Sequence, residues 1–225
     1  MIKDTIWAGG CLHGDFPHLN RFTGDYPMDF VYLGDCCPKG LSAKEQMVYM
    51  RYVFFPWVEK FPNHINRYLI PGNHDAWAEL DEARSICEEF DFNLIIDQSF
   101  NLVFGNRTYK CYGTPWTVKP KGWNKYHWAF GDEDGNLEDR FEQIPHDVDI
   151  VFSHSPAYGM LDCGLTSDDR MINIGSQSLR QVLEYRKFKY FIHSHEHFHG
   201  GKTVYHPPTN KKYINVAQQI MEISF

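Results

Sequence analysis

The sequence predicts an α/β fold in which two β-sheets stack face to face and helices cover their outer sides. Two patterns lead to this expectation. Short apolar runs alternate with amphipathic segments in the N-terminal half, and short strands dominate the C-terminal part. With 225 residues the chain is long enough to bury a sizeable core, and no repeat or composition shift marks a boundary. We therefore expect a single domain spanning residues 1–225.

The N-terminal half alternates strands with helices. Strands are expected at residues 5–8, 29–33, 67–70 and 92–96, each a short apolar run. From Ser42 to about Phe61, apolar residues recur at three- and four-residue steps, which predicts an amphipathic helix. Ser42 and Glu45 match a capping box at its start. A second helix is expected at about residues 78–90.

The second half begins with a predicted hairpin, residues 100–104 and 108–112, around Gly105-Asn106. Further on, strands are expected at 149–152 and 189–192, a helix at 177–186, and closing antiparallel strands at 204–205, 213–216 and 220–223. Residues 114–130 between these parts are rich in Trp, Pro and Gly. Such a long irregular segment predicts a functional loop. Its aromatic side chains either pack between the sheets or form a wall that stacks on a substrate ring.

Composition excludes several classes of function. The chain has 22 Lys and Arg against 29 Asp and Glu, a net charge of −7, which argues against wrapping of nucleic acid. A small phosphorylated ligand held through metal remains compatible with this charge. No apolar run approaches the roughly 20 residues of a membrane helix, and the N-terminus lacks a secretory h-region. Six cysteines without a disulfide-like spacing predict reduced thiols and a cytoplasmic protein.

Polar clusters follow the predicted strands, and they carry the functional signal. They are Gly10-Cys11-Leu12-His13-Gly14, Gly34-Asp35, Gly72-Asn73-His74-Asp75, Ser153-His154-Ser155-Pro156 and Ser194-His195-Glu196-His197. Each comes just after a short apolar run, so each is expected at a strand end. Oxygen and nitrogen ligands delivered from several strand ends to one rim are what a two-metal hydrolytic centre needs.

This ordered series resembles the calcineurin-like metallophosphoesterase superfamily, whose pattern runs Asp-x-His, Gly-Asp, Gly-Asn-His-Asp/Glu, His and Gly-His-x-His. The resemblance extends from about Trp7 to Val216. Within the superfamily, the run Tyr112-Gly113-Thr114-Pro115-Trp116-Thr117 is similar to the small phosphodiesterase group related to the brain-expressed metallophosphoesterase-domain proteins. The resemblance implies a four-layer sandwich of two mixed β-sheets flanked by helices.

The resemblance also implies two divalent transition-metal ions, of manganese, iron or zinc, and attack on phosphorus by a hydroxide that bridges them. It assigns the first ion to His13, Asp35, His197 and whatever Cys11 supplies, and the second ion to Asp35, Asn73, His154 and His195. His193 and His199 are expected to lie outside this ligand set.

The implied substrate contacts centre on the Gly72-Asn73-His74-Asp75 cluster. His74 would donate to a phosphoryl oxygen or protonate the leaving group, and Asp75 is a candidate to orient it. Asn73 is a second substrate-binding candidate, and Lys39 and Trp116 are weaker ones.

Two departures from the family pattern affect these expectations. Pro38 and Lys39 stand where many members have Asp-Arg, which disfavours a protein phosphatase because Lys39 offers only a point charge. Cys11 stands where the pattern has its first aspartate. A thiolate binds borderline metals at about 2.3 Å, against about 2.0–2.2 Å for a carboxylate, and favours zinc or iron over manganese or magnesium. The alternative is that Cys11 does not ligate and leaves the first site weak.

The leading hypothesis is therefore a phosphodiesterase or phosphomonoesterase acting on a small nucleotide-like substrate. An alternative is a catalytically weakened phosphate-binding or scaffold protein whose first metal site is incomplete at Cys11. A nuclease is less favoured, because the chain is acidic and carries no basic stripe. No pattern in the sequence indicates an oligomeric state.

Overall fold

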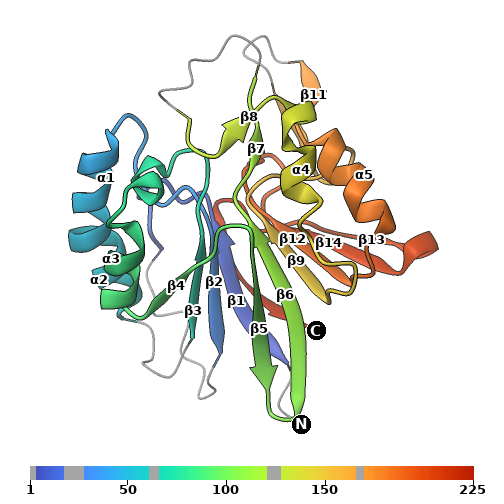
Figure 1. The fold of residues 1–225 in the computed structure, drawn as a ribbon, viewed down its shortest axis with the longest axis horizontal. Helices are drawn as coiled ribbons and strands as arrows, with labels where there is room; N and C mark the ends of the chain where they lie inside the picture. Colours follow the sequence, from blue (N-terminus) through green and yellow to red (C-terminus); the bar gives the residue numbers. More distant parts are fainter. Residues whose placement is uncertain (1–3, 18–27, 61–65, 121–127, 166–169) are drawn as a thin grey trace.

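Two large mixed β-sheets form the centre of the molecule, and helices lie outside both (Figure 1). The structure, a computed structural model, describes residues 4–17, 28–60, 66–120, 128–165 and 170–225. Helices α1, α2 and α3 lie beside the first sheet, and α4 and α5 beside the second (Figure 1). The predicted four-layer arrangement is confirmed.

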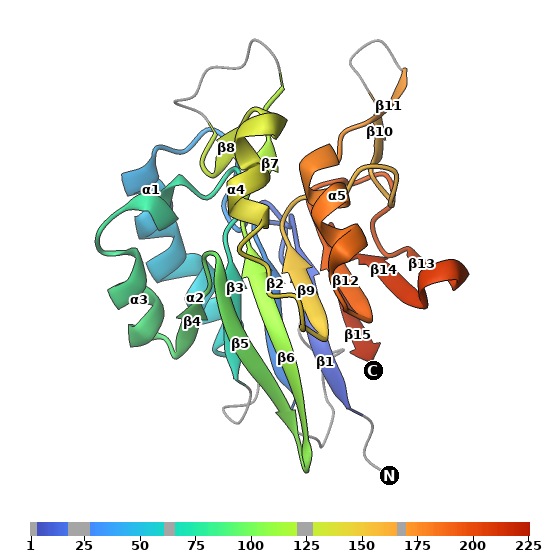
Figure 2. The same ribbon diagram turned by 45° about the vertical axis from the view of Figure 1, so that its right-hand side comes forward.

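The first sheet has five strands in the order β15-β1-β2-β3-β4. Their bounds are β1 Thr5–Gly10, β2 Asp29–Leu33, β3 Arg67–Ile70, β4 Phe92–Leu94 and β15 Gln219–Ser224. Strands β1 to β4 run parallel, so their carboxyl ends meet at one edge. Strand β15 pairs antiparallel with β1, and Figure 2 shows it beside that strand.

The second sheet has six strands in the order β13-β14-β12-β9-β6-β5. Their bounds are β5 Gln98–Phe104, β6 Arg107–Thr114, β9 Ile150–Ser153, β12 Tyr190–His193, β13 Thr203–His206 and β14 Lys211–Asn215. The closing strands were expected to be antiparallel. That holds for β13 with β14 and for β15 with β1, but β14 also runs parallel to β12.

The core is layered by the alternation of side chains along each strand. Val31 and Leu33 of β2 face the second sheet and pack with residues such as Phe152 of β9. Phe30 and Tyr32 of the same strand point the other way, into the cluster beneath the helices. Burial on both faces explains why the parallel strands read as continuous apolar runs in the sequence.

The first helical region runs from Ala43 to Val58 without a break, and its predicted capping box is present. It consists of α1 (Ala43–Tyr49), a π-helical turn (Met50–Phe54) and α2 (Phe55–Val58). Pro56 accounts for the wider turn, because it has no N–H to give to the carbonyl four residues earlier. The predicted end at Phe61 lies outside the described residues.

The second predicted helix is shorter than expected. A 3₁₀ turn at Ala76–Glu79 precedes α3, which covers only Ala83–Glu89. Leu80 has extended backbone angles and separates the two. Strand β4, which follows, also ends two residues before its predicted limit.

Beside the second sheet, α5 covers Gln177–Tyr185 and begins at the side-chain cap of Ser176. Helix α4 (Glu138–Phe141) and the 3₁₀ turn before it (Asp134–Leu137) have no counterpart in the sequence prediction. The small hairpin of β10 (Cys163–Leu165) and β11 (Met171–Asn173) was also not predicted.

The aromatic-rich segment 114–130 contains strand β7 (Thr117–Val118), which pairs in parallel with β8 (Gly131–Asp132) just after the segment. Trp123 and Tyr126 of this segment lie outside the described residues. Within the described ranges, no helix combines the length and apolarity needed to cross a bilayer. The structure describes all six cysteines as free thiols.

The carboxylate of Asp75 joins the loops that follow β2 and β3. Its Oδ2 accepts hydrogen bonds from the amides of Asp35 at 2.6 Å and Gly72 at 2.8 Å, and its Oδ1 accepts from the amide of Cys36 at 3.0 Å. We expected Asp75 to orient the His74 imidazole. That expectation is wrong, because both carboxylate oxygens accept hydrogen bonds from backbone amides instead. The side chain is fully buried, so no water substitutes for these bonds.

Replacing this carboxylate should destabilise the whole fold. In Asp75→Asn one oxygen becomes an NH₂ group that faces an amide donor, and we expect unfolding free energy to fall by about 3 kcal/mol. Urea denaturation measures the change. Asp139→Asn, at an exposed position on α4, should stay within about 0.5 kcal/mol. An Asp75→Asn midpoint equal to that control would contradict this account of the junction.

Candidate metal centre

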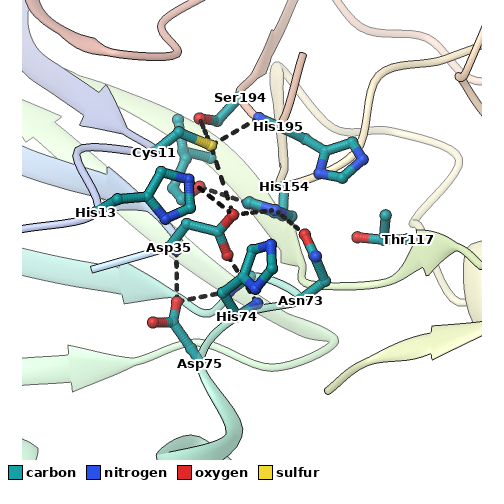
Figure 3. A network of polar contacts seen from close by, with 12 residues as sticks. Cys11, His13, Asp35, Asn73, His74, Asp75, Thr117, His154, Ser194 and His195 are labelled. Carbon is teal, nitrogen blue, oxygen red and sulfur yellow. Dashed lines mark hydrogen bonds and ion pairs between the residues drawn. The ribbon is translucent and has the colours of Figure 1, made fainter. Parts of the chain in front are cut away.

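The predicted site residues follow five strands, three from the first sheet and two from the second. Cys11 and His13 follow β1, Asp35 follows β2, and the Asn73-His74 pair follows β3. His154 follows β9, and His195 and His197 follow β12. The sequence-predicted convergence of strand ends at one place is therefore found (Figure 3).

Several of these residues have strained backbones. Cys11, His13, Asp35 and His195 have positive φ angles of 52°, 47°, 58° and 65°. Left-handed conformations of residues other than glycine cost on the order of 1 kcal/mol each and persist where surrounding structure enforces them. Their concentration at these strand ends marks the place as a candidate functional site.

Two glycines allow the strand ends to approach one another. A Cβ atom on Gly34 would lie closer than 3.0 Å to the amide of Gly72 and to the His154 ring. A Cβ on Gly72 would meet the Asp35 carboxylate and the same ring at similarly forbidden distances. Gly72 therefore allows the loop after β3 to pack closely against Asp35 and His154.

Asp35 lies at the middle of the cluster and is buried. Its Oδ2 is 3.6 Å from Nε2 of His13 and 3.6 Å from Nε2 of His154. Its Oδ1 accepts a hydrogen bond from the backbone amide of His74 at 2.9 Å. Burial raises the pKa of the Asp35 carboxyl, and a cation beside it would offset that cost.

The hydrogen bonds of His154 show which of its two ring nitrogens carries the proton. Its Nδ1 lies 2.7 Å from the Leu33 carbonyl, which can only accept, so Nδ1 carries the proton. Burial lowers the pKa of His154 to about 4, so the ring is neutral and Nε2 is a bare lone pair. That nitrogen faces Oδ1 of Asn73 at 3.0 Å as well as Oδ2 of Asp35. Three acceptors that converge with no proton between them fit a bound cation.

The first half of the centre contains His13, His197 and Cys11. Their ligand atoms lie within 4.8 Å of one another, and those of Cys11, Asp35 and His154 form a second such group. Burial, with a smaller effect of Lys39, lowers the pKa of His13 to about 3 and also lowers that of His197. Nδ1 of His13 is buried without a hydrogen-bond partner among the described residues. Neutral imidazoles, a carboxylate and a sulfur are suitable ligands for zinc, iron or manganese.

His195 lies beside these groups. Its ring is 5.1 Å from that of His154, centre to centre, and in Figure 3 it extends toward Thr117, away from Asp35. Neither group of closely spaced ligand atoms among the described residues includes it. His193, expected outside the ligand set, is fully buried and bonded to the Ser194 carbonyl. His199 is bonded to Glu196.

The two weaker substrate-binding candidates differ in position. Lys39 is exposed, and its charge contributes to the lowered pKa of His13 and His197 after burial, which places it near the centre. Trp116 donates its indole N–H to Asp97 at 2.6 Å and lies under the Arg140 guanidinium at 4.5 Å. Its described partners are thus scaffold residues.

Sequence reasoning missed three residues that shape the site. Trp128, from the aromatic-rich segment, lies 6.2 Å from the His195 ring, and the amide of the next residue donates to the Asn73 carbonyl at 2.9 Å. Ser194 donates its hydroxyl to the Cys11 sulfur at 3.0 Å. The buried carboxylate of Glu196 accepts backbone amides of residues 198 and 199 and so shapes the loop carrying His197. Only the aromatic run gave a signal in the sequence.

Known proteins resemble this chain in sequence and in fold. The chain is 28% identical to UPF0046 protein C25E10.12 of Caenorhabditis elegans over 68% of its own length and 56% of that protein, so it spans little more than half of that relative. TT1561 of Thermus thermophilus superposes with a TM-score of 0.64 at 15% identity over 99% of both chains. The phosphopantetheinyl hydrolase PptH of Mycobacterium tuberculosis gives 0.55 at 12% identity, over 95% of this chain and 88% of its own.

At such identities the two structures show a shared fold and no more. The family model for calcineurin-like phosphoesterases, however, matches residues 5–199, a range that contains every one of the clustered strand-end residues. The chain belongs to the calcineurin-like phosphoesterase family.

Proposed function

We propose that this protein is a metal-dependent phosphoesterase that hydrolyses a phosphodiester or phosphomonoester of a small nucleotide-like substrate. One observation carries the proposal. Oδ2 of Asp35, Oδ1 of Asn73 and Nε2 of His154 converge without a proton to share, in a chain of the phosphoesterase family. This arrangement is what a divalent cation would complete.

The proposed ligands divide into two sets that share Asp35. His13, His197, Asp35 and Cys11 would hold one ion, and Asp35, Asn73, His154 and His195 the other. Iron and zinc accept all of these ligands, and manganese accepts the carboxylate and imidazole ligands among them. When bound, two divalent ions polarise phosphoryl oxygens and lower the pKa of a water molecule so that it can attack phosphorus at neutral pH.

The chain's own residues position and protonate the substrate. His74 is half-buried, and its backbone is fixed by the hydrogen bond to Asp35. Its ring lies 5.4 Å from that of His13, centre to centre, at the side of the cluster. From there its N–H would donate to a phosphoryl oxygen or to the leaving group. The ammonium of Lys39 supplies positive charge toward a phosphate, and Trp128 offers a ring surface beside His195.

The alternative of a catalytically weakened scaffold rests on Cys11 standing where the family pattern has its first aspartate. The closeness of its sulfur to the other ligand atoms supports the enzyme over this alternative. A nuclease stays disfavoured by the net charge of −7. We keep a small phosphorylated substrate as the proposed partner and the cytoplasm as the proposed compartment.

Removal of the His74 ring should abolish hydrolysis. With bis-p-nitrophenyl phosphate and whichever of manganese, zinc, iron or nickel gives the highest rate, we expect kcat of His74→Ala to fall by about 10²- to 10⁴-fold, because the variant loses its proton donor. A chelator should remove the activity of the unmodified protein. His206→Ala, on the outer strand β13, is the matched control and should keep full activity. Absence of turnover by the unmodified protein with manganese, zinc, iron and nickel would refute the proposed function.

Lys39 should affect substrate binding more than turnover. Since the side chain is exposed, its contribution is that of a screened surface charge, and we expect Lys39→Ala to raise KM about two- to fivefold with kcat nearly unchanged. Added salt should shrink the difference. Lys44→Ala, an exposed lysine on α1, serves as the control. Steady-state kinetics with a phosphomonoester decide, and equal KM values for both variants would exclude Lys39 from substrate binding.

A further inference from the structure

The sulfur of Cys11 has an environment that differs from that of the other thiols. The side chain is 1% exposed, and the sulfur accepts two hydrogen bonds, from the Ser194 hydroxyl at 3.0 Å and from the backbone amide of His195 at 3.1 Å. The thiol itself faces Oδ2 of Asp35 at a long 3.8 Å. Donors directed at sulfur stabilise the negative charge of a thiolate.

We propose that Cys11 is a thiolate ligand of the metal centre, that Ser194 is its positioning residue, and that the centre consequently selects zinc, iron(II) or cobalt(II) over manganese and magnesium. This inference rests on the proposed function, since it concerns the same centre. It goes further, because it assigns the chemical character of the site and a partner for the sulfur.

Position supports the assignment. Cys11 is the one residue shared by the two groups of ligand atoms found among the described residues, with His13 and His197 in one and Asp35 and His154 in the other. A sulfur at that place would touch a cation bound by either group. The strained backbone of Cys11, with φ of 52°, turns the side chain inward immediately after β1.

Ser194 is built into this arrangement. Its side chain is fully buried and reaches the Cys11 sulfur from β12's end, across the boundary between the two sheets. The hydroxyl also fills the space that a Cβ on Gly10 would occupy. Hydrogen bonds from outside the ligand set orient metal ligands, and their loss weakens metal affinity by about 10- to 100-fold.

Binding is a simple exchange at sulfur. The metal–sulfur bond forms, the S–H bond breaks, and the proton leaves to solvent, with no change of oxidation state. Burial and the neighbouring Asp35 raise the pKa of the Cys11 thiol in the metal-free chain, so the thiolate forms as the cation binds and balances its charge. Thiolate is a soft ligand, so it adds affinity for zinc, cobalt and iron(II) and little for manganese or magnesium.

Cobalt(II) gives a direct test because thiolate-to-cobalt charge transfer absorbs in the near ultraviolet. The full chain is loaded anaerobically with cobalt(II), and the band should appear as metal binds. It should vanish in Cys11→Ser while Cys163→Ser, a partly exposed cysteine on β10, retains it. Cys11→Asp should lose the band, bind metal at an unchanged ratio, and shift its preference from zinc toward manganese.

Ser194→Ala tests the positioning role. We expect cobalt(II) affinity to fall about 10- to 100-fold and the charge-transfer band to move to lower energy, because the thiolate loses a donor. A loss of packing alone would not move the band. If Cys11→Ser does not fold, zinc X-ray absorption of the unmodified protein gives the same answer, with a scattering path near about 2.3 Å for sulfur.

The outcomes separate this proposal from the proposed function. Cobalt bound without a sulfur signal, or a band that survives Cys11→Ser, overturns the role of Cys11 even if hydrolysis is observed. A sulfur signal in a protein that hydrolyses no phosphoester supports Cys11 ligation and overturns the proposed function. A protein that binds neither cobalt nor zinc overturns both.

Discussion

The whole centre depends on how one buried carboxylate, that of Asp75, holds the amides of Asp35, Cys36 and Gly72. These bonds fix the loop after β2 against the loop after β3. Asp35 is thereby placed with its own carboxylate toward His13 and His154 and with Oδ1 on the amide of His74. Because these three donors are backbone amides, their contacts with Asp75 do not depend on the side chains of the two loops. The indole N–H of Trp77 adds a longer hydrogen bond to Oδ1 of Asp75 at 3.4 Å.

Electrostatics and packing act together at this place. Burial keeps the imidazoles of His13 and His154 neutral, with pKa values lowered to about 3 and about 4. The same burial raises the pKa of Asp35. The fold thus holds unprotonated ligand atoms close together on strained backbone, which is unfavourable by itself and is expected where a bound cation compensates the cost. Gly34 and Gly72 allow the loops that carry these atoms to approach without a steric clash.

Much of this could be predicted from the sequence, because parallel strands bring their carboxyl ends to one edge and His154 and Asp35 directly follow apolar runs. The role of Asp75 could not, since proximity to His74 in sequence suggested a contact while the carboxylate folds back onto backbone amides. The contact of Ser194 with Cys11 joins residues 183 positions apart, and no spacing of residue types in the sequence indicates such a contact. Pro56 was visible, but the π-helical turn before it depends on hydrogen-bond register rather than on apolar spacing.

The pairing of β1 with β15 has a consequence for how the candidate centre forms. Thr5 pairs with Ser224, and Gly10, just before Cys11, pairs with Gln219. The strand that leads into Cys11 and His13 is therefore held on one side by a segment far away in the sequence. Such long-range pairings form slowly, because the intervening chain must first be ordered. We therefore expect the loop carrying Cys11 and His13 to reach its final position late in folding, together with the closure of this sheet.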